Sequence, residues 1–307
     1  MKCKDLTTIA DLSLEDINEL FALTTELKES YKRNETDHCL AGKTLGMIFE
    51  KSSMRTRVSF EAAMTQMGGH AIYLTKQDIN LGVRESVKDV ASVLSRYVDC
   101  ITIRTYAHET VVELADSASV PVINALSDYT HPCQALADLY TIKEKKGSLE
   151  NIKLAYVGDG NNVARSLAFL CAKLNVSCRI ASPENYELSA GFLKEVKGIA
   201  TPGTSIEQYR EPKKAVENAD VIYTDTWVSM GKEKEVETRR NDFKGYQVNS
   251  ELVSLAKKDV FVMHCLPAHR GEEITDDVID GPNSIVYDQA ENRLHIQKAL
   301  LKLLICK

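Results

Sequence analysis

The pattern of apolar and polar positions begins with one helix and then alternates between short apolar runs and amphipathic segments. A helix is expected from Ser13, where Asp16 completes a capping box. The apolar face of this helix is expected to contain Ile17, Leu20, Phe21, Leu27 and Tyr31. Four apolar runs follow, at residues 44–50, 71–75, 100–106 and 121–126, with helical segments at 58–67 and 86–97. Short buried strands separated by helices are typical of a parallel sheet.

A second series of the same kind occupies the rest of the chain. A long helix is predicted from Gln134 to Lys146, ending at Gly147. Apolar runs follow at 153–159, 177–182, 220–227, 260–267 and 284–289, and a final helix is predicted from about 290 to 304. The pattern therefore predicts two α/β domains with a hinge near residues 132–150. We expect the last helix to return to the first domain, which then comprises residues 1–133 and 290–307, while the second comprises 134–289.

Composition narrows the classes of function. The 307 residues are 44% hydrophobic and 27% charged, close to the average for soluble globular proteins. The net charge is -6 without a long run of one sign, which argues against nucleic acid or a membrane surface as partner. The eight cysteines form no CxxC pair and are expected to be reduced. Without a secretory signal or an apolar run near the ~20 residues of a membrane span, a soluble, cytoplasmic protein is expected.

The motif KSSMRTR follows the first predicted strand and leads into a helix. The unpaired amides at a helix N-terminus favour an anion. Ser53 and Thr56 add hydroxyl groups, and Arg55 and Arg57 add guanidinium groups that match phosphate oxygens. The motif lacks the glycines of a P-loop. A phosphate site is one interpretation, and a serine N-cap followed by two solvated arginines is the other.

Three more polar residues stand at the ends of predicted elements in the first half of the chain. Arg104 ends a strand that should be buried, where a guanidinium requires either an internal carboxylate or a bound anion. His131 and Gln134 stand at the start of the long helix. A neutral imidazole can polarise a carbonyl, and a glutamine amide can bind an amide-like NH2 group. A structural ion pair at Arg104 and a simple turn at His131 are the alternatives.

The sequence GDGNN, residues 158–162, lies between a predicted strand and a helix, as a dinucleotide-binding turn does. The third glycine of that fingerprint is replaced by Val163, and the following strand ends in Ser182 where an acidic residue would be expected. A nicotinamide cofactor is therefore not expected. Asn161 and Asn162 stand at the carboxyl end of a strand, where such sheets bind ligands. The alternative is a tight turn that favours asparagine and glycine.

Two motifs near the end of the chain also follow strands. DTWVSMG offers Asp225, whose carboxylate could pair with a substrate ammonium, or which could be an ordinary acid at the end of a strand. HCLPAHRG contains His264, Cys265 and His269, but no second Cys/His group stands nearby to complete a zinc site, so no metal is expected. A nucleophilic Cys265 would lack a third residue to orient the pair.

The order of these motifs is more specific than any one of them. S-x-R-T-R, an arginine on a later strand, HPxQ, GDGNN, DxWxSMG and HCLPAHRG in succession resemble the transcarbamylase family, the ornithine carbamoyltransferases in particular. DxWxSMG and HCLP separate the ornithine branch from the aspartate carbamoyltransferases. The resemblance runs from Asp5 to the last helix. It implies two doubly wound parallel-sheet domains flanking a cleft, assembled as homotrimers or multiples of trimers.

The resemblance also implies a role for each matching residue. Carbamoyl phosphate would be bound by Ser53, Met54, Arg55, Thr56, Arg104, His131, Gln134, Cys265, Leu266 and Arg293. The α-amino and α-carboxylate groups of ornithine would be held by Asn162, Asp225, Ser229 and Met230. Arg104, His131 and Cys265 would form the catalytic group, with Cys265 shaping the ornithine pocket and not attacking covalently. The implied reaction transfers the carbamoyl group to the side-chain amine of ornithine without a metal or organic cofactor.

Two positions depart from the family pattern. Met54 stands where threonine is usual, which removes a hydroxyl group but keeps the backbone amide. Asn80 is shorter than the His or Gln of some relatives that contacts the ligand of the neighbouring subunit. The cluster of Arg55, Arg57 and Arg104 is expected to lower the pKa of the attacking amine. A nicotinamide oxidoreductase and a non-catalytic binding homologue remain alternatives, and N-acetylornithine, putrescine and lysine are alternative acceptors.

Overall fold

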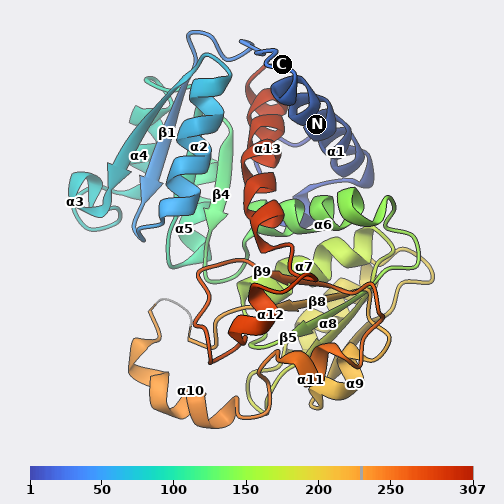
Figure 1. Ribbon diagram of the computed structural model, residues 1–307. Helices are drawn as coiled ribbons and strands as arrows, with labels where there is room; N and C mark the ends of the chain where they lie inside the picture. The colour runs from blue at the N-terminus through green and yellow to red at the C-terminus, as the bar shows by residue number, and fades with distance from the viewer. Residues whose placement is uncertain (229–230, 307) are drawn as a thin grey trace. The chain divides into compact units, whose positions relative to one another are not determined.

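The computed structural model describes residues 1–228 and 231–306, and they divide into two compact units (Figure 1). Unit 1 comprises Met1–Ala137 and Glu291–Lys307, and unit 2 comprises Asp138–Ala290. The chain passes from unit 1 to unit 2 within helix α6 (Pro132–Lys146) and returns within helix α13 (Val286–Ile305). The units divide four residues later along α6 than the sequence suggests, and one residue later at α13.

Unit 1 is built on a parallel sheet. Among its described residues, four strands lie in the order β2-β1-β3-β4. The strands are β1 (Thr44–Phe49), β2 (His70–Thr75), β3 (Cys100–Arg104) and β4 (Val122–Leu126). The helices besides α6 and α13 are η1 (Ile9–Asp11), α1 (Leu14–Lys32), α2 (Met54–Gln66), α3 (Lys76–Ile79), α4 (Val87–Leu94) and α5 (His108–Ser117). Every residue of β3 is buried, so this strand is covered on both faces. The edge strand β2 is buried at none of its positions.

Unit 2 has the same plan. Among its described residues, five parallel strands lie in the order β7-β6-β5-β8-β9. They are β5 (Lys153–Val157), β6 (Ser177–Ala181), β7 (Ile206–Tyr209), β8 (Val221–Thr224) and β9 (Phe261–His264). The helices are α7 (Asn162–Lys173), α8 (Ala190–Gly198), α9 (Pro212–Val216), η2 (Glu233–Glu235), α10 (Val236–Asp242), α11 (Ser250–Val253) and α12 (Asp276–Ile279). Two parallel-sheet α/β units are therefore confirmed.

Most predicted elements are found, with three corrections. Ser13 caps α1 with the expected capping box, but Tyr31 at the end of that helix is exposed. The strand predicted at 284–289 is wrong: Ser284 makes only an isolated bridge to Val262, and α13 begins at Val286. A short apolar run fits a buried helix as well as a strand. Strand β7 was not predicted, because its four residues contain only two apolar ones and only Ile206 is buried.

The strand orders identify where each sheet can bind a ligand. In unit 1 the chain moves outward from β1 to β2 and then returns to the other side of β1 with β3. In unit 2 the same reversal occurs between β5 and β8. A crevice opens at the carboxyl ends of the strands where the direction of winding reverses, and ligands of open α/β sheets bind there. The motif KSSMRTR follows β1, and the motif GDGNN follows β5. Arg104 is the last residue of β3, and Asp225 comes directly after β8.

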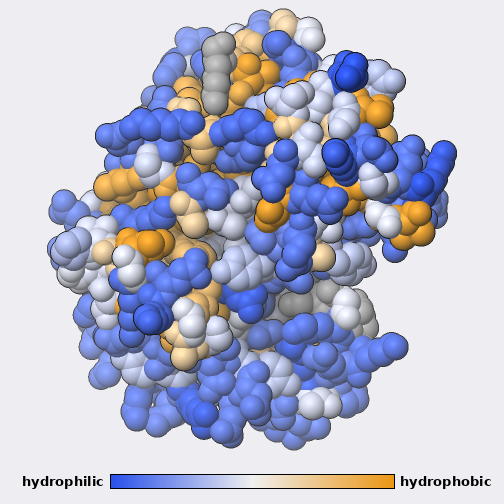
Figure 2. Space-filling view, turned by 180° about the vertical axis from the view of Figure 1, so that it is seen from behind, coloured by the Kyte–Doolittle hydropathy of each residue, from blue (hydrophilic) through white to orange (hydrophobic). Residues whose placement is uncertain are grey.

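The surface gives one further fact. None of the described helices combines the length and apolar character needed to cross a membrane. The face of the molecule drawn in Figure 2 is mostly hydrophilic, and the hydrophobic residues on it lie in separate groups.

Candidate active site

The start of α2 forms the first part of a polar site at the β1/β3 reversal of unit 1. Ser53 is the N-cap, and its hydroxyl accepts a hydrogen bond from the Thr56 amide over 3.3 Å and donates to the Thr56 hydroxyl over 3.1 Å. Thr56 is buried, whereas the Met54 side chain is exposed. The predicted N-cap therefore exists, and the amides of the first turn supply the positive end of a helix dipole.

Arg293 of α13 joins this helix start to the start of α6. Its guanidinium donates to Oε1 of Gln134 over 2.6 Å and to Oγ1 of Thr56 over 3.0 Å. Nη1 also lies 3.4 Å from Nε2 of His131. All four side chains are at least 95% buried. Four residues from three separate stretches of the chain, all predicted to bind carbamoyl phosphate, thus form one connected group in unit 1.

His131 is held in its neutral form at this site. Burial is the main cause that lowers its pKa well below the usual range, and Arg293, Arg104 and Arg55 lower it further. Arg104 is itself buried at the end of β3, and Arg55 is partly exposed on α2. Three guanidinium groups therefore act on one buried imidazole, and the local potential is strongly positive.

Arg57 does not belong to this cluster. Its Nε donates to Oε1 of Glu61 over 2.9 Å, and its guanidinium lies over the ring of Tyr73 at 3.9 Å. Arg57 lies two positions past Arg55, on another side of the helix, and its effect on an attacking amine stays a prediction. Asn80 ends α3 in the left-handed conformation, with φ of 48°.

In unit 2, Asp225 is the centre of a second polar group, at the β5/β8 reversal. It is buried, and its Oδ2 accepts a hydrogen bond from Nδ2 of Asn161 over 2.8 Å. Its Oδ1 accepts from the Cys265 thiol over 2.9 Å and from the Thr226 amide over 2.7 Å. The ends of β5, β8 and β9 thus contribute to one carboxylate-centred site. Cys265 and Leu266, predicted to bind carbamoyl phosphate, lie in this unit and not in unit 1.

Asn161, and not only the predicted Asn162, organises the GDGNN turn. Asn161 is the N-cap of α7, and its Oδ1 accepts from the amides of Val163 and Ala164 over 2.9 and 3.1 Å. Those amides are the ones that would face a pyrophosphate in a dinucleotide site. A Cβ atom on Gly160 would lie 2.8 Å from the backbone of Tyr186 and Leu188, so this glycine serves packing. Asn162 is the first residue of α7 and is partly exposed.

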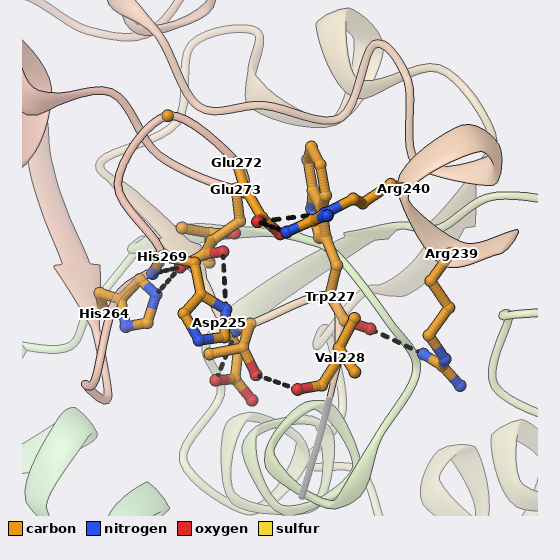
Figure 3. Close-up of polar contacts among 12 residues, drawn as sticks. Asp225, Trp227, Val228, Arg239, Arg240, His264, His269, Glu272 and Glu273 are labelled. Atoms are coloured by element: carbon orange, nitrogen blue, oxygen red, sulfur yellow. Dashed lines mark hydrogen bonds and ion pairs between the residues drawn. The ribbon is translucent and has the colours of Figure 1, made fainter. Parts of the chain in front are cut away.

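A buried arginine that the sequence did not reveal supports the segment after Asp225. Arg239 of α10 donates to the Trp227 carbonyl over 2.8 Å (Figure 3). The same guanidinium donates to Oδ2 of Asp159 over 2.7 Å. Burial raises the pKa of Asp159, and Arg239 opposes that rise. The Trp227 ring stacks on Phe243, just after α10. The predicted ornithine contacts Ser229 and Met230 lie outside the described residues.

The HCLP turn after β9 is fixed by a buried histidine. Nε2 of His264 bonds Oε1 of Glu273 over 2.9 Å (Figure 3). Nδ1 accepts from the Leu266 amide over 2.9 Å. The proton of the neutral ring is therefore on Nε2. Ligand atoms of Asp225, His264 and Cys265 lie within 4.8 Å of one another. Both His264 nitrogens already have partners, so binding of a metal there would break one of these bonds.

Comparison with known proteins decides the family. The model "Aspartate/ornithine carbamoyltransferase, carbamoyl-P binding domain" matches residues 4–144, and the model "Aspartate/ornithine carbamoyltransferase, Asp/Orn binding domain" matches residues 150–304. The chain belongs to the aspartate/ornithine carbamoyltransferase family. The second family model extends to residue 304 and so includes most of α13, although the part of that helix from Glu291 onward belongs to unit 1.

Individual members of this carbamoyltransferase family are similar over almost the whole chain. Ornithine carbamoyltransferase of Bacillus subtilis is 56% identical over 305 residues, covering 99% of this chain and 94% of that protein. The protein of the same name from Halalkalibacterium halodurans is 54% identical, covering 99% and 96%. The structure of ornithine carbamoyltransferase from Pyrococcus furiosus matches with a TM-score of 0.96 at 53% identity, covering 99% of this chain and 97% of that one.

Proposed function

We propose that the chain transfers the carbamoyl group of carbamoyl phosphate to the side-chain amine of L-ornithine, which gives L-citrulline and phosphate. The observation that carries this proposal is the convergence of Arg293, Arg104 and Arg55 on buried His131 in unit 1. Three guanidinium groups in a buried site suit a phosphate dianion. Membership of the carbamoyltransferase family and relatives named ornithine carbamoyltransferase at 53–56% identity support the choice of reaction.

We assign carbamoyl phosphate to the group around Arg293. Its phosphate would accept hydrogen bonds from the first amides of α2 and from Ser53, Arg55 and Arg104, with Met54 contributing only its amide. Neutral His131 and Arg104 would polarise the carbonyl oxygen and stabilise the oxyanion that forms. Gln134 would bind the carbamoyl NH2 group through Oε1, which has a second lone pair besides the one that Arg293 uses.

We assign the amino-acid end of ornithine to the group around Asp225. A buried carboxylate is costly unless cations or hydrogen-bond donors meet it. Asn161, Thr226 and Cys265 supply three donors, and the α-ammonium group of ornithine would supply the balancing charge. Asn162, with Ser229 and Met230, would bind the α-carboxylate and α-amino groups. Cys265 would orient Asp225 and border the pocket, and would not attack covalently.

The chemistry needs a neutral amine. An amine like that of lysine has a pKa of ~10.4, so roughly one molecule in 2,500 is neutral at pH 7. The guanidinium groups that surround His131 would lower the pKa of an amine brought next to them, because like charges repel. The amine nitrogen then attacks the carbamoyl carbon, a proton leaves the nitrogen, and the tetrahedral intermediate expels phosphate. Carbamoyl phosphate carries its own leaving group, so we propose that no metal or organic cofactor takes part.

The test is a colorimetric citrulline assay with purified protein, carbamoyl phosphate and four amines: ornithine, lysine, putrescine and N-acetylornithine. The expected result is carbamoylation of ornithine in preference to the other three. Absence of any carbamoylated product would favour a non-catalytic binding homologue. NAD binding by fluorescence titration would instead favour an oxidoreductase, which the capping of α7 by Asn161 argues against.

We further propose a homotrimer or a multiple of trimers. Met54 and Val58 lie one turn apart on α2, and Ile72 lies on the neighbouring edge strand β2; all three are exposed, as is Val83. Exposed apolar side chains on neighbouring elements are typical of a subunit interface. Light scattering should give three times the mass of the chain or a multiple of it, and Val58→Asp should lower that mass. A monomer in the wild type would contradict the proposal.

We also propose a cytoplasmic location. All eight cysteines are free thiols, which fits a reducing compartment. Fractionation of the source cells with an antibody against the chain tests this proposal, and recovery outside the cytoplasmic fraction would contradict it.

A further inference from the structure

Two thiols that are 267 positions apart in the chain meet in unit 1. The Cys306 thiol, just after α13, donates to the carbonyl oxygen of Cys39 over 3.2 Å. Partial burial, and next to it the neighbouring Cys306 thiol, raise the pKa of Cys39 to about 12. One turn before Cys306, Lys302 forms an ion pair of 2.7 Å with Asp37. The segment after α1 and the end of α13 are therefore held together at two adjacent points.

Both thiols are accessible to a small reagent. Cys306 is exposed and Cys39 is partly exposed, whereas Cys100, Cys133, Cys171 and Cys178 are buried. A groove of about 550 Å³ lies beside Cys306 and is lined by residues of α1 and α13, among them Leu23 and Leu303. A reagent of the size of a short peptide can therefore approach the Cys306 sulfur.

We propose that Cys39 and Cys306 form a redox-active dithiol that a low-molecular-weight disulfide converts reversibly into a protein disulfide. In the first step the Cys306 thiolate attacks one sulfur of the reagent, and one reduced thiol leaves. In the second step Cys39 loses its proton and attacks the Cys306 sulfur, and the second reduced thiol leaves. Two protein thiols are oxidised by two electrons, and the reagent disulfide is reduced to two thiols.

Cys306 is the first nucleophile because it is the more exposed of the two. The raised pKa of Cys39 leaves little thiolate on that residue at neutral pH, so Cys39 acts second, when the Cys306 sulfur is already activated. The proposal goes beyond carbamoyl transfer and does not depend on it.

The disulfide would fasten the final helix to the first part of unit 1. That unit consists of two chain segments, and α13 carries Arg293, which completes the site on α2 and α6. Cys306 lies 13 residues after Arg293, about 20 Å along a helix, so the bond would leave the site geometry unchanged. Its effect should be on stability, because a crosslink that closes a long loop restricts the unfolded chain.

The experiment uses the full chain, fully reduced and then incubated with oxidised glutathione, quenched with iodoacetamide under denaturing conditions and analysed by mass spectrometry. The number of alkylated thiols should fall by two from the eight of the reduced chain, and peptide mapping should give a Cys39–Cys306 link. The midpoint of thermal unfolding should rise by about 5 °C or more, while carbamoyl transfer stays within about twofold.

Three controls make the result specific. Cys39→Ser should accumulate a glutathione adduct on Cys306 that does not resolve, and Cys306→Ser should form no crosslink. The Cys178 thiol likewise raises the pKa of neighbouring Cys171, but both residues are buried and should stay reduced. The proposal is overturned if wild-type protein keeps all eight thiols, if a glutathione adduct on Cys306 persists without a link to Cys39, or if crosslinks form only between chains. An unchanged unfolding midpoint after oxidation would overturn the stabilising role.

Discussion

Arg293 donates a hydrogen bond of 2.6 Å to Gln134, although 159 positions separate the two residues in the chain. The same guanidinium binds Thr56 at a separation of 237 positions. Arg293 is thus the residue through which the final helix reaches two other helix starts in unit 1. Replacing Arg293 should therefore affect Gln134 and Thr56 at once, since the ammonium group of a lysine cannot replace a bidentate guanidinium.

We predict that Arg293→Lys raises the KM for carbamoyl phosphate by about 10- to 100-fold. Buried hydrogen bonds to charged groups contribute ~1.5–3 kcal/mol each, and lysine should retain only part of them. Steady-state kinetics at saturating ornithine measures the effect. Arg57→Ala is the matched control, because Arg57 contacts Glu61 and Tyr73, and it should stay within about twofold of wild type. Equal losses in both variants would contradict the assignment.

We predict that Arg239→Gln selectively impairs the acceptor side of the reaction. The change leaves Asp159 buried without its ion pair, which costs ~3–5 kcal/mol of stability, and it frees the Trp227 carbonyl. The KM for ornithine should rise more than the KM for carbamoyl phosphate, because these contacts lie in unit 2. Denaturant unfolding and kinetics measure the two effects. Asp159→Asn combined with Arg239→Gln should recover much of the stability, since it removes the uncompensated charge, but not the ornithine KM.

We predict that His295 makes the protein less stable at low pH. Burial is the largest of the causes that lower the pKa of His295 to about 4, whereas in the unfolded chain it is near 6.5. Below pH 6.5 the unfolded state therefore binds a proton that the folded state does not. The free energy of unfolding should fall by up to ~1.4 kcal/mol per pH unit from pH 6.5 towards 4, and should be flat above 6.5 for this group.

His295→Gln should reduce that slope, because glutamine does not titrate but can still donate to Glu291 as Nε2 does over 3.2 Å. Urea unfolding at pH 4.5, 5.5, 6.5 and 7.5 measures the difference between variant and wild type. An identical pH dependence in both proteins would assign the acid sensitivity to other groups.

The sequence predicted most strands, and the structure brings several of the candidate site residues together around Arg293 and around Asp225. The failures have physical reasons. The apolar periodicity predicted eight of the strands, and the residues at the helix starts predicted the N-caps at Ser13 and Ser53. Both kinds of feature depend only on residues that are close together in the sequence. The periodicity could not distinguish the apolar run at 284–289 from a helix start. In the GDGNN turn it selected Asn162, although Asn161 bonds Asp225; the N-cap position before a helix was the available signal.

Residues that act through distant partners gave no signal at all. Arg239 lies in the mainly charged segment ETRR, which is typical of a solvated helix face. Its side chain is nevertheless only 2% exposed. Only the fold brings it to Asp159, 80 positions earlier. The contact between Cys39 and Cys306 is of the same kind. Sequence patterns report local periodicity and local capping, whereas these contacts depend on how strands and helices pack.

The acceptor is the prediction on which the choice within the carbamoyltransferase family rests. Asp225 is buried at the end of β8 and holds three hydrogen bonds with fixed geometry, so its carboxylate is positioned to receive one more donor. We predict that Asp225→Asn lowers kcat/KM for ornithine by at least 100-fold, because an amide cannot balance the α-ammonium charge, a loss of ~3 kcal/mol. The KM for carbamoyl phosphate should change little.

The wild type should also prefer ornithine over lysine at least tenfold in kcat/KM. One extra methylene is typically worth ~1–3 kcal/mol in a fitted site, and the longer side chain would carry its amine past the carbamoyl carbon. Putrescine lacks the α-carboxylate, and N-acetylornithine lacks the charge that Asp225 would meet. Competition assays with equal concentrations of the four amines give the ratios directly. If putrescine or N-acetylornithine is carbamoylated faster than ornithine, the acceptor assigned to the Asp225 site is wrong. The carbamoyl phosphate site assigned to the group around Arg293 would be unaffected by that result, because it is tested with a different substrate.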